Sequence, residues 1–302
     1  MKKIILIIVS LIVTTPVLFG QQLNTVSQYS QDYYLINPAY AGVTKNLPIT
    51  GIYKQFFSGL AGSPTYQSLS GHMLVVDNMG AGGRIFNYQA GPISKTGIEG
   101  SYAYVLDLNG SGMKLSLGLS AQMSQFYLNK SMLFLEDAND NSVTYATDKM
   151  ITPDFNFGGF FFDEEKGYYA GLSIYQLLGR STDMMNDDYL TNSQVRHYFF
   201  NGGYKYKVND DIMVEPSIML KFIESGITQI DINASVLYKK LVYAGLSYRT
   251  NNAIAFMFGV KAQDFFFGYA YDYNLSALKS YSVGSHELMV SYTFGKVSRS
   301  EL

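Results

Sequence analysis

The strongest constraint in this sequence is an alternation of apolar and polar residues with a period of two, which recurs from residue 47 to residue 294. The segment from Lys114 to Met123 is the clearest example, because Leu, Ala and Met alternate there with Ser, Gly and Gln. Successive side chains of a β-strand point to opposite faces, so this period predicts strands. The segment is about ten residues long, the length with which a tilted strand crosses a bilayer.

Fourteen such segments follow one another along the chain. They cover residues 47–57, 66–77, 80–90, 94–107, 112–125, 154–163, 167–177, 196–207, 212–223, 227–239, 241–250, 252–262, 264–274 and 284–294. An even number of strands suits an up-and-down barrel whose two ends lie on the same side of a membrane. We therefore predict an all-β fold, a transmembrane up-and-down antiparallel β-barrel of about 14 strands. The two longer connections, 126–153 and 178–195, are expected to be loops or caps and are candidates for a partner-facing surface.

A soluble β-sandwich also alternates, but composition favours the membrane. Charged residues make up 15% of the chain, well below the ~25% of soluble domains. The polar strand face carries mostly small uncharged residues, as a barrel lumen does, where a soluble protein would expose Lys and Glu. Tyr and Phe gather near strand ends, as in the aromatic girdles of membrane barrels. These aromatic residues are Tyr102, Tyr104, Tyr204, Tyr206, Phe265, Phe266, Phe267, Tyr269, Tyr271 and Tyr273.

The N-terminus has the order of residues found in export signals. Lys2 and Lys3 are followed by an apolar run and then by small residues up to Gly20. This order predicts a signal peptide over residues 1–20 that is removed on export, with the cell outer membrane as destination. A retained anchor helix is the alternative, although the apolar run is short and Pro16 interrupts its end. Beyond it, no apolar run approaches the ~18 residues of a membrane-spanning helix.

Charge and cysteine content exclude several classes of protein. The net charge is −2 and no basic block occurs, which argues against nucleic acid as a partner. The absence of Cys excludes disulfides, thiolate catalysis, cysteine metal sites and a lipidated cysteine anchor. We expect four parts: the signal peptide, a plug-like or periplasmic entry segment over 21–46, the barrel over 47–294 and a C-terminal tail over 295–302.

Two motifs carry a resemblance to a known family. Near the N-terminus, residues 33–36 (Tyr-Tyr-Leu-Ile) precede residues 37–42 (Asn-Pro-Ala-Tyr-Ala-Gly), and residues 28–29 are Gln-Tyr. Near the C-terminus, residues 271–276 (Tyr-Asp-Tyr-Asn-Leu-Ser) precede residues 284–287 (Gly-Ser-His-Glu). This combination resembles the entry motif and closing signature of the PorP/SprF family of type IX secretion and gliding-associated membrane proteins. The candidate interaction residues are Asn37, Pro38, Tyr40, Gly42, Tyr271, Asp272, Asn274, Ser285, His286 and Glu287.

The resemblance implies an outer-membrane barrel of Bacteroidota without catalytic activity. Members of this family work with type IX secretion and gliding machinery, often as the dedicated partner of one large surface protein. Some members are linked to the periplasmic, peptidoglycan-associated part of the apparatus. One departure from the general outer-membrane pattern is that Gly295 to Leu302 follow Phe294, where a last strand usually ends the chain on an aromatic residue.

The entry motif has an explanation in turn chemistry alone. Asn37 favours a cap or a turn, Pro38 fixes φ, and Gly42 permits conformations that a Cβ would forbid. These residues therefore predict a turn that plugs the barrel or leads into the first strand. A periplasmic docking segment is the functional alternative.

Residues with catalytic or ligand-binding chemistry form no recognised site. His72, His197 and His286 are far apart and show no zinc-binding spacing, and we expect His286 at the rim, bonded to neighbouring backbone. Ser285 and His286 are adjacent in a strand and face opposite ways, which excludes a catalytic pair.

Two further stretches match only part of a ligand-binding motif. Asp137, Asn139 and Asn141 follow calcium-loop spacing, but Ser142 replaces the required Gly and Asp148 the required Glu. We expect a solvated loop there. Residues 80–83 (Gly-Ala-Gly-Gly) precede no helix pattern, so we expect a strand lined with small residues instead of a phosphate cradle. The acidic stretches 163–166 and 184–188 are expected to be solvated or to receive a partner.

Three functions remain open at this point. The first is a non-enzymatic barrel that assists secretion or surface anchoring of a large partner protein through type IX machinery, with outer-membrane lipid as its surroundings. The second is a passive porin or solute channel, in which Glu99, Lys114, Glu215 and Lys221 form a filter or a polar lining. The third, a barrel enzyme, has no motif in its favour. No cofactor and no metal are expected.

Overall fold

The computed structural model describes residues 26–295 except 109, 111, 134–148, 181–193, 225, 227, 251 and 252. The predicted signal peptide, almost all of the predicted tail, the calcium-like stretch and the acidic stretch at 184–188 therefore lie outside the described residues. Within them, no helix is long and apolar enough to cross a membrane.

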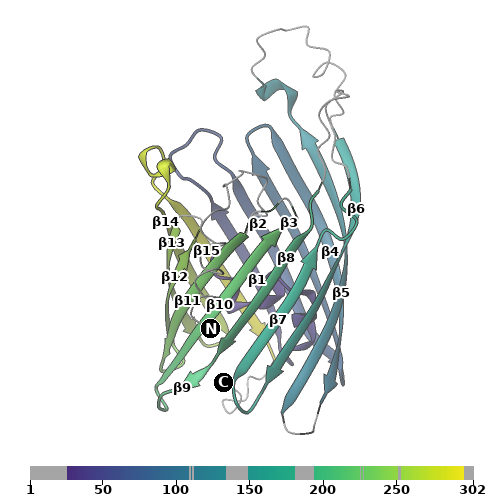
Figure 1. Ribbon diagram of the computed structural model, residues 1–302, viewed down its shortest axis with the longest axis vertical. Helices are drawn as coiled ribbons and strands as arrows, with labels where there is room; N and C mark the ends of the chain where they lie inside the picture. Colours follow the sequence, from purple (N-terminus) through teal and green to yellow (C-terminus); the bar gives the residue numbers. More distant parts are fainter. Residues whose placement is uncertain are drawn as a thin grey trace, which may run out of the picture.

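The described chain forms a closed antiparallel barrel of 14 strands, which confirms the predicted fold (Figure 1). The strands are β1 (Leu47–Gln55), β2 (Thr65–Val76), β3 (Met79–Ala90), β4 (Ile93–Asp107), β5 (Met113–Leu128), β6 (Lys149–Asp163), β7 (Tyr168–Tyr175), β8 (His197–Tyr204), β9 (Tyr206–Lys207), β10 (Ile212–Ile223), β11 (Thr228–Tyr238), β12 (Val242–Arg249), β13 (Ala253–Ala262), β14 (Phe265–Asn274) and β15 (Ser285–Phe294). The short β9 follows β8 after one residue and pairs with the same neighbour, β10, so the two make one interrupted strand of the barrel.

Each strand pairs with its neighbours in sequence, and the ring closes where the first strand meets the last. β1 and β15 pair along nine residues each, from Leu47 opposite Phe294 to Gln55 opposite His286. This seam closes the sheet on itself, as a bilayer requires of a membrane-spanning sheet.

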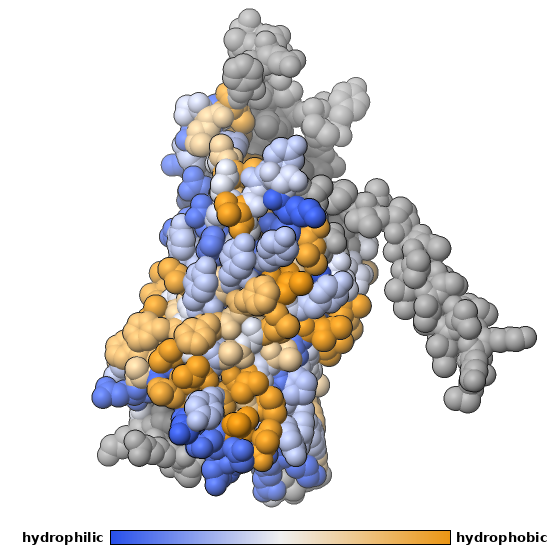
Figure 2. Space-filling model, turned by 90° about the vertical axis from the view of Figure 1, so that its left-hand side faces the viewer, coloured by the Kyte–Doolittle hydropathy of each residue, from blue (hydrophilic) through white to orange (hydrophobic). Residues whose placement is uncertain are grey.

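The two faces of the wall divide as the alternation predicts. In β5, Leu117, Leu119 and Met123 are exposed on the outside, whereas Ser116 and Ser120 are buried in the lumen. Figure 2 shows apolar side chains gathered across the wall, with hydrophilic ones toward both ends. Phe265 and Phe267 belong to this outer surface, but Phe266 points inward and packs against Tyr243.

The two ends of the barrel differ in their connections. One end carries the connections 56–64, 129–148, 176–196 and 275–284, and we call it the long-loop end. The opposite, short-turn end carries tight turns such as 77–78, 164–167 and 263–264, together with the start of β1 and the end of β15. The two connections predicted as long loops therefore leave the barrel at the same end.

Candidate functional site

The lumen is filled by the chain segment that precedes β1. Residues 26–43, which we call the plug, lie inside the barrel and form three 3₁₀ turns, η1 (Tyr29–Gln31), η2 (Tyr33–Leu35) and η3 (Pro38–Gly42) (Figure 1). The plug begins beside Lys54, near the long-loop end of β1. It ends at Gly42 beside Gly80, near the short-turn end of β3. The plug therefore runs lengthwise through the barrel before the chain enters the wall.

Short polar side chains fix the turns of the plug. The Asp32 carboxylate accepts a hydrogen bond from the Tyr34 N–H and so caps η2. The Asn37 side-chain oxygen accepts from the Ala39 N–H at 3.0 Å and caps η3, with Pro38 as the first residue of the turn. Pro suits this place because the first N–H of a helical turn has no partner within the turn. The Asn-Pro pair thus defines the sharp turn that the sequence predicts.

Asn37 also joins the plug to the barrel wall. Its side-chain amide donates to the carbonyl oxygens of Gly159 on β6 at 3.0 Å and Leu172 on β7 at 3.3 Å. The residue is completely buried. One side chain therefore caps a turn of the plug and binds two neighbouring strands.

The wall is shaped to receive the plug. A Cβ on Gly118 would overlap the backbone of Pro38 and Ala39, and a Cβ on Gly158 would overlap the Asn37 side chain. Wall hydroxyls complete the fit, since Ser116 donates to the Ala39 carbonyl at 2.6 Å. The small residues of the lumen face therefore make room for a polypeptide segment. The stretch at 80–83 belongs to the same surface, because Gly80 and Gly82 lie against Gly42 and Tyr34.

A buried ion cluster holds the beginning of the plug. The backbone N–H groups of Ser27 and Gln28 donate to the two oxygens of Glu287 at 2.5 and 2.9 Å. Lys54 Nζ lies 2.8 Å from Asp272 and 3.2 Å from Glu287, and it donates to Ser27 Oγ at 2.6 Å. These two carboxylates and the ammonium group come from β14, β15 and β1, so the cluster spans the closing seam of the barrel.

The cluster continues along the wall to β11 and β12. Arg249 on β12 donates to Asp272 at 3.0 Å, and its Nε lies 3.5 Å from Asp231 on β11. Lys54, Asp231, Asp272 and Glu287 are all at most 4% exposed. Because buried charges require partners, the plug and five strands depend on one another in this region.

A second group of polar contacts lies in the lumen closer to the short-turn end. His72 Nε2 on β2 is 3.0 Å from the Asp32 carboxylate, and Thr50 on β1 donates to the same carboxylate at 3.2 Å. On the other side of the plug, Tyr33 and Tyr169 share a hydrogen bond of 2.6 Å between their hydroxyls. Asn233 on β11 donates to the Tyr29 hydroxyl of η1 at 2.8 Å, so each turn of the plug is bound to the wall through polar groups.

The predicted interaction residues fall into two groups. Asn37, Pro38 and Gly42 belong to the plug and are buried, and Tyr40 packs against Tyr33 of the plug and Phe160 of β6. Of the C-terminal motif, Asp272 and Glu287 point inward and bind the plug, as described above. Asn274 and Ser285 also point inward, and Ser285 Oγ accepts from the Phe57 N–H at 3.1 Å.

The remaining members of the C-terminal motif face outward. His286 Nδ1 lies 2.7 Å from the Tyr269 hydroxyl, and its ring packs on Tyr271. The prediction that His286 bonds to neighbouring backbone is thus wrong, since its partner is a phenol. Tyr271 donates to the Val283 carbonyl at 2.7 Å. Among the described residues, no group of His, Asp and Glu side chains is arranged to hold a metal ion.

Several residues of the site belong to no sequence motif. Lys54, Asp231 and Arg249 are single charges at inward-facing positions of alternating strands, and that parity is the signal that would have found them. Of the four charges considered for a filter, Glu99 pairs with Arg84 and Glu215 accepts from Tyr169. Lys114 pairs with Glu164. Lys221 is also buried in the lumen.

Replacing Asn37 by Ala is expected to loosen the plug. The variant loses the cap of η3 and both bonds to strand carbonyls, so we expect a loss of about 2–3 kcal/mol in the free energy of unfolding. Because the chain has no Trp, far-ultraviolet circular dichroism during a urea titration in detergent is the measurement.

Asn209→Ala is the matched control for that variant. Asn209 caps an exposed turn through the Asp211 and Ile212 N–H groups but binds no second strand. Its loss should stay near 1 kcal/mol. Equal losses in the two variants would contradict a docking role for Asn37.

Comparison with known proteins identifies the family of this chain. The family model described as type IX secretion system membrane protein PorP/SprF matches residues 18–292. The chain belongs to the PorP/SprF family. It is thus a membrane protein of a family assigned to type IX secretion, with the fold of an outer-membrane barrel. No curated protein sequence matches it.

Solved structures add evidence on the fold of this PorP/SprF protein. The CymD monoaromatic hydrocarbon channel is 12% identical, with 91% of this chain and 94% of that chain covered and a TM-score of 0.50. The KdgM porin is 12% identical, with 82% and 99% covered and a TM-score of 0.41. At 12% identity the likeness to CymD concerns the barrel fold alone.

Proposed function

We propose that this PorP/SprF barrel acts in the outer membrane as a non-enzymatic component of type IX secretion or gliding machinery, assisting the secretion or surface anchoring of a large partner protein. The observation that carries this proposal is the filled lumen. Residues 26–43 occupy the barrel lengthwise, and Asp272 and Glu287 hold their beginning through buried hydrogen bonds. A plugged barrel has its surfaces and loops available for binding, while a path for solutes is closed.

The two ends of the barrel supply different contacts in this proposal. In outer-membrane barrels, short turns face the periplasm and longer loops face the exterior. The long-loop end, which carries the connections 129–148 and 176–196, would then meet the partner at the cell surface. The short-turn end, with the start of β1 and the end of β15, would face the periplasmic components of the machinery.

Crosslinking in the native outer membrane tests this function. Cells are treated with a mild lysine-reactive crosslinker, and the barrel is extracted in detergent and purified through an affinity tag. We expect a very large exported protein or type IX components to be recovered with it. Recovery of the barrel alone, together with steady ion conductance of the purified protein in a planar bilayer, would contradict the proposal and favour a porin.

A further inference from the structure

One strand of the barrel wall is paired along its whole length on one side but along only part of its length on the other. β6 pairs with β5 from Lys149 to Asp163, but with β7 only from Phe157 to Phe162. β7 ends at Tyr175, and Gln176 adopts a left-handed backbone conformation with φ of 63°. β6 therefore continues toward the long-loop end beyond the point where β7 stops (Figure 1).

The backbone pattern shows which groups of β6 lie along this edge. In an antiparallel strand, the N–H and C=O of one residue point to the same neighbour, and alternate residues serve opposite neighbours. Glu164 donates to Gly112 on the β5 side, whereas Phe155 accepts from Leu177 on the β7 side. The N–H and C=O groups of residues 149, 151 and 153 therefore point away from β5. In the described ranges, no strand pairs with this segment, which we call the upper β6 edge (residues 149–153).

Pro153 occupies a position at which this edge tolerates it. Pro has no N–H, so within a sheet it is found where that group would face outward from an edge. The upper β6 edge thus offers the carbonyl groups of Lys149, Ile151 and Pro153, and the N–H groups of Lys149 and Ile151 only. These groups recur at every second residue, a spacing that an extended polypeptide matches.

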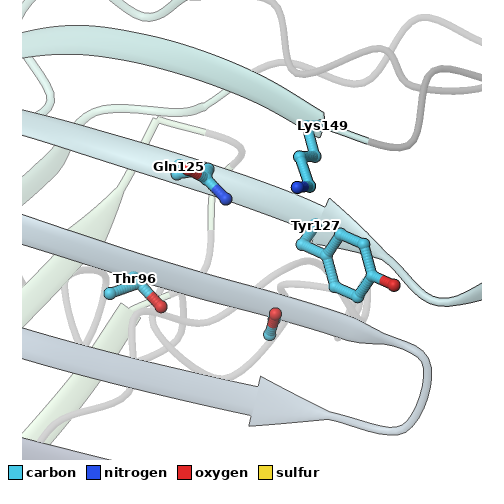
Figure 3. Close-up of a pocket in the computed structure, with 5 residues that line it drawn as sticks. Thr96, Gln125, Tyr127 and Lys149 are labelled. Atoms are coloured by element: carbon cyan, nitrogen blue, oxygen red, sulfur yellow. The ribbon is translucent and has the colours of Figure 1, made fainter.

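The surroundings place the Lys149 end of this edge outside the hydrocarbon layer. Beside Lys149 the outer face of β4 to β6 is polar and holds a shallow pocket of about 350 Å³, whereas Pro153 lies opposite the exposed, apolar Met123. It is lined by Ser94, Thr96, Gln125, Tyr127 and Lys149, which come from three neighbouring strands (Figure 3). Open sheet edges do not occur in contact with lipid chains, and a polar outer face indicates water. The Lys149 end of the upper β6 edge therefore lies on the water side of the barrel wall.

The positive charge beside the pocket indicates that a partner would carry an acidic side chain. Lys149 is the charged residue among the five that line it, and no carboxylate belongs to that lining. Its ammonium group lies 5.9 Å from the centre of the Tyr127 ring. An acidic side chain on an incoming strand would pair with this cation.

We propose that the upper β6 edge binds an extended strand of a second protein, which adds to the barrel wall by backbone hydrogen bonds and places an acidic side chain beside Lys149. This inference rests on the proposed function and names the contact through which the surface partner docks. A lipid would not match the alternating backbone groups, and a globular surface would leave them unpaired.

Ile151→Pro and Ile151→Val form the pair that tests this contact. The Pro variant removes one edge N–H at a position equivalent to Pro153, so the barrel is expected to fold; a retained gel-mobility shift on heating checks this. The Val variant keeps the N–H. The probe is the exported protein that crosslinks to the wild-type barrel in the outer membrane. We expect Ile151→Pro to reduce its recovery about tenfold and Ile151→Val to leave it unchanged.

Lys149 provides a second variant that is independent of backbone effects. Lys149→Glu should reduce recovery of the same exported protein, and Lys149→Arg should retain it. If wild type and all variants recover the partner equally, the edge is not the docking site although the proposed function stands. If no variant, including wild type, recovers it, the proposed function itself fails.

A photoreactive amino acid at position 151 identifies the neighbour directly. Mass spectrometry of the crosslinked peptide is expected to show a strand of another protein with an acidic residue near the attachment point. Crosslinks to residues 134–148 or 181–193 of this chain would overturn the inference, because the edge would then be covered internally. Crosslinks to a second copy of the barrel would overturn it as well.

Discussion

Deleting residues 26–43 is expected to convert the closed barrel into an open channel. The plug fills the lumen from Lys54 near one end to Gly80 near the other, and its removal leaves a wall lined by Gly, Ser and charged side chains. Fourteen strands enclose more space than their own side chains fill, since about eight strands suffice for a filled interior. In a planar bilayer the deletion variant should show discrete conductance steps, whereas the complete protein should remain at the baseline.

A second variant displaces the plug without shortening the chain and so tests whether the deletion itself causes the conductance. Gly118→Val with Gly158→Val leaves the chain complete but places side chains where Pro38, Ala39 and Asn37 lie. We expect this double variant to conduct also, and Gly100→Val, at an outward site with nothing within 4 Å of its Cβ, to stay closed. A folded deletion variant that does not conduct would mean that the wall closes the lumen by itself.

Replacing Lys54 by Met is expected to have the largest effect of any single substitution described here. It leaves Asp272 and Glu287 buried with one counter-charge fewer, and Ser27 loses a donor. Removal of one partner from a buried ion pair costs about 3–5 kcal/mol, because the remaining charge has no solvent to stabilise it. Urea unfolding in detergent, followed by circular dichroism, should show this loss, and residual conductance should accompany it as the plug loosens.

Lys207→Met is the control for that experiment. Lys207 pairs with Asp210, but both side chains are exposed, at 69% and 97%, and solvent screens such a pair so that its loss should hardly change stability. Adding Glu287→Gln to Lys54→Met should recover part of the loss, since one buried charge is then removed. A Lys54→Met barrel as stable as the control would show that the cluster does not hold the plug.

The sequence predicted the wall well because one physical rule governs it. A strand between lipid and a packed lumen must alternate, and the 14 segments with that period are the 14 strands of the barrel. The prediction was least accurate where the rule weakens. β5 extends to Leu128 and β6 begins at Lys149, several residues beyond the predicted limits. These extensions carry apolar residues on both faces, with Leu128 and Met150 packed together inside and Ile151 exposed outside, so the period of two is lost there.

The interior could not be predicted in the same way. The small residues of the lumen face indicated a polar lining, but in the structure they accommodate the plug, as Gly118 and Gly158 show. Turn chemistry indicated the bend at Asn37, yet not its bonds to β6 and β7. The contact of Ser27 with Glu287 joins residues 260 positions apart. No local pattern encodes such a pairing.

The position of the ion cluster has a consequence for the order of assembly. Lys54 and Glu287 are direct cross-strand partners in the seam between β1 and β15, and both bind the beginning of the plug. The plug is synthesised before every strand of the barrel, while the carboxylates that secure its beginning arrive with the last two strands. A barrel that lacks its final hairpin therefore leaves the beginning of the plug without its carboxylate partners, so closure of the ring and attachment of this part of the plug become a single event. We therefore expect the plug to be held at both of its ends only in a barrel whose ring has closed.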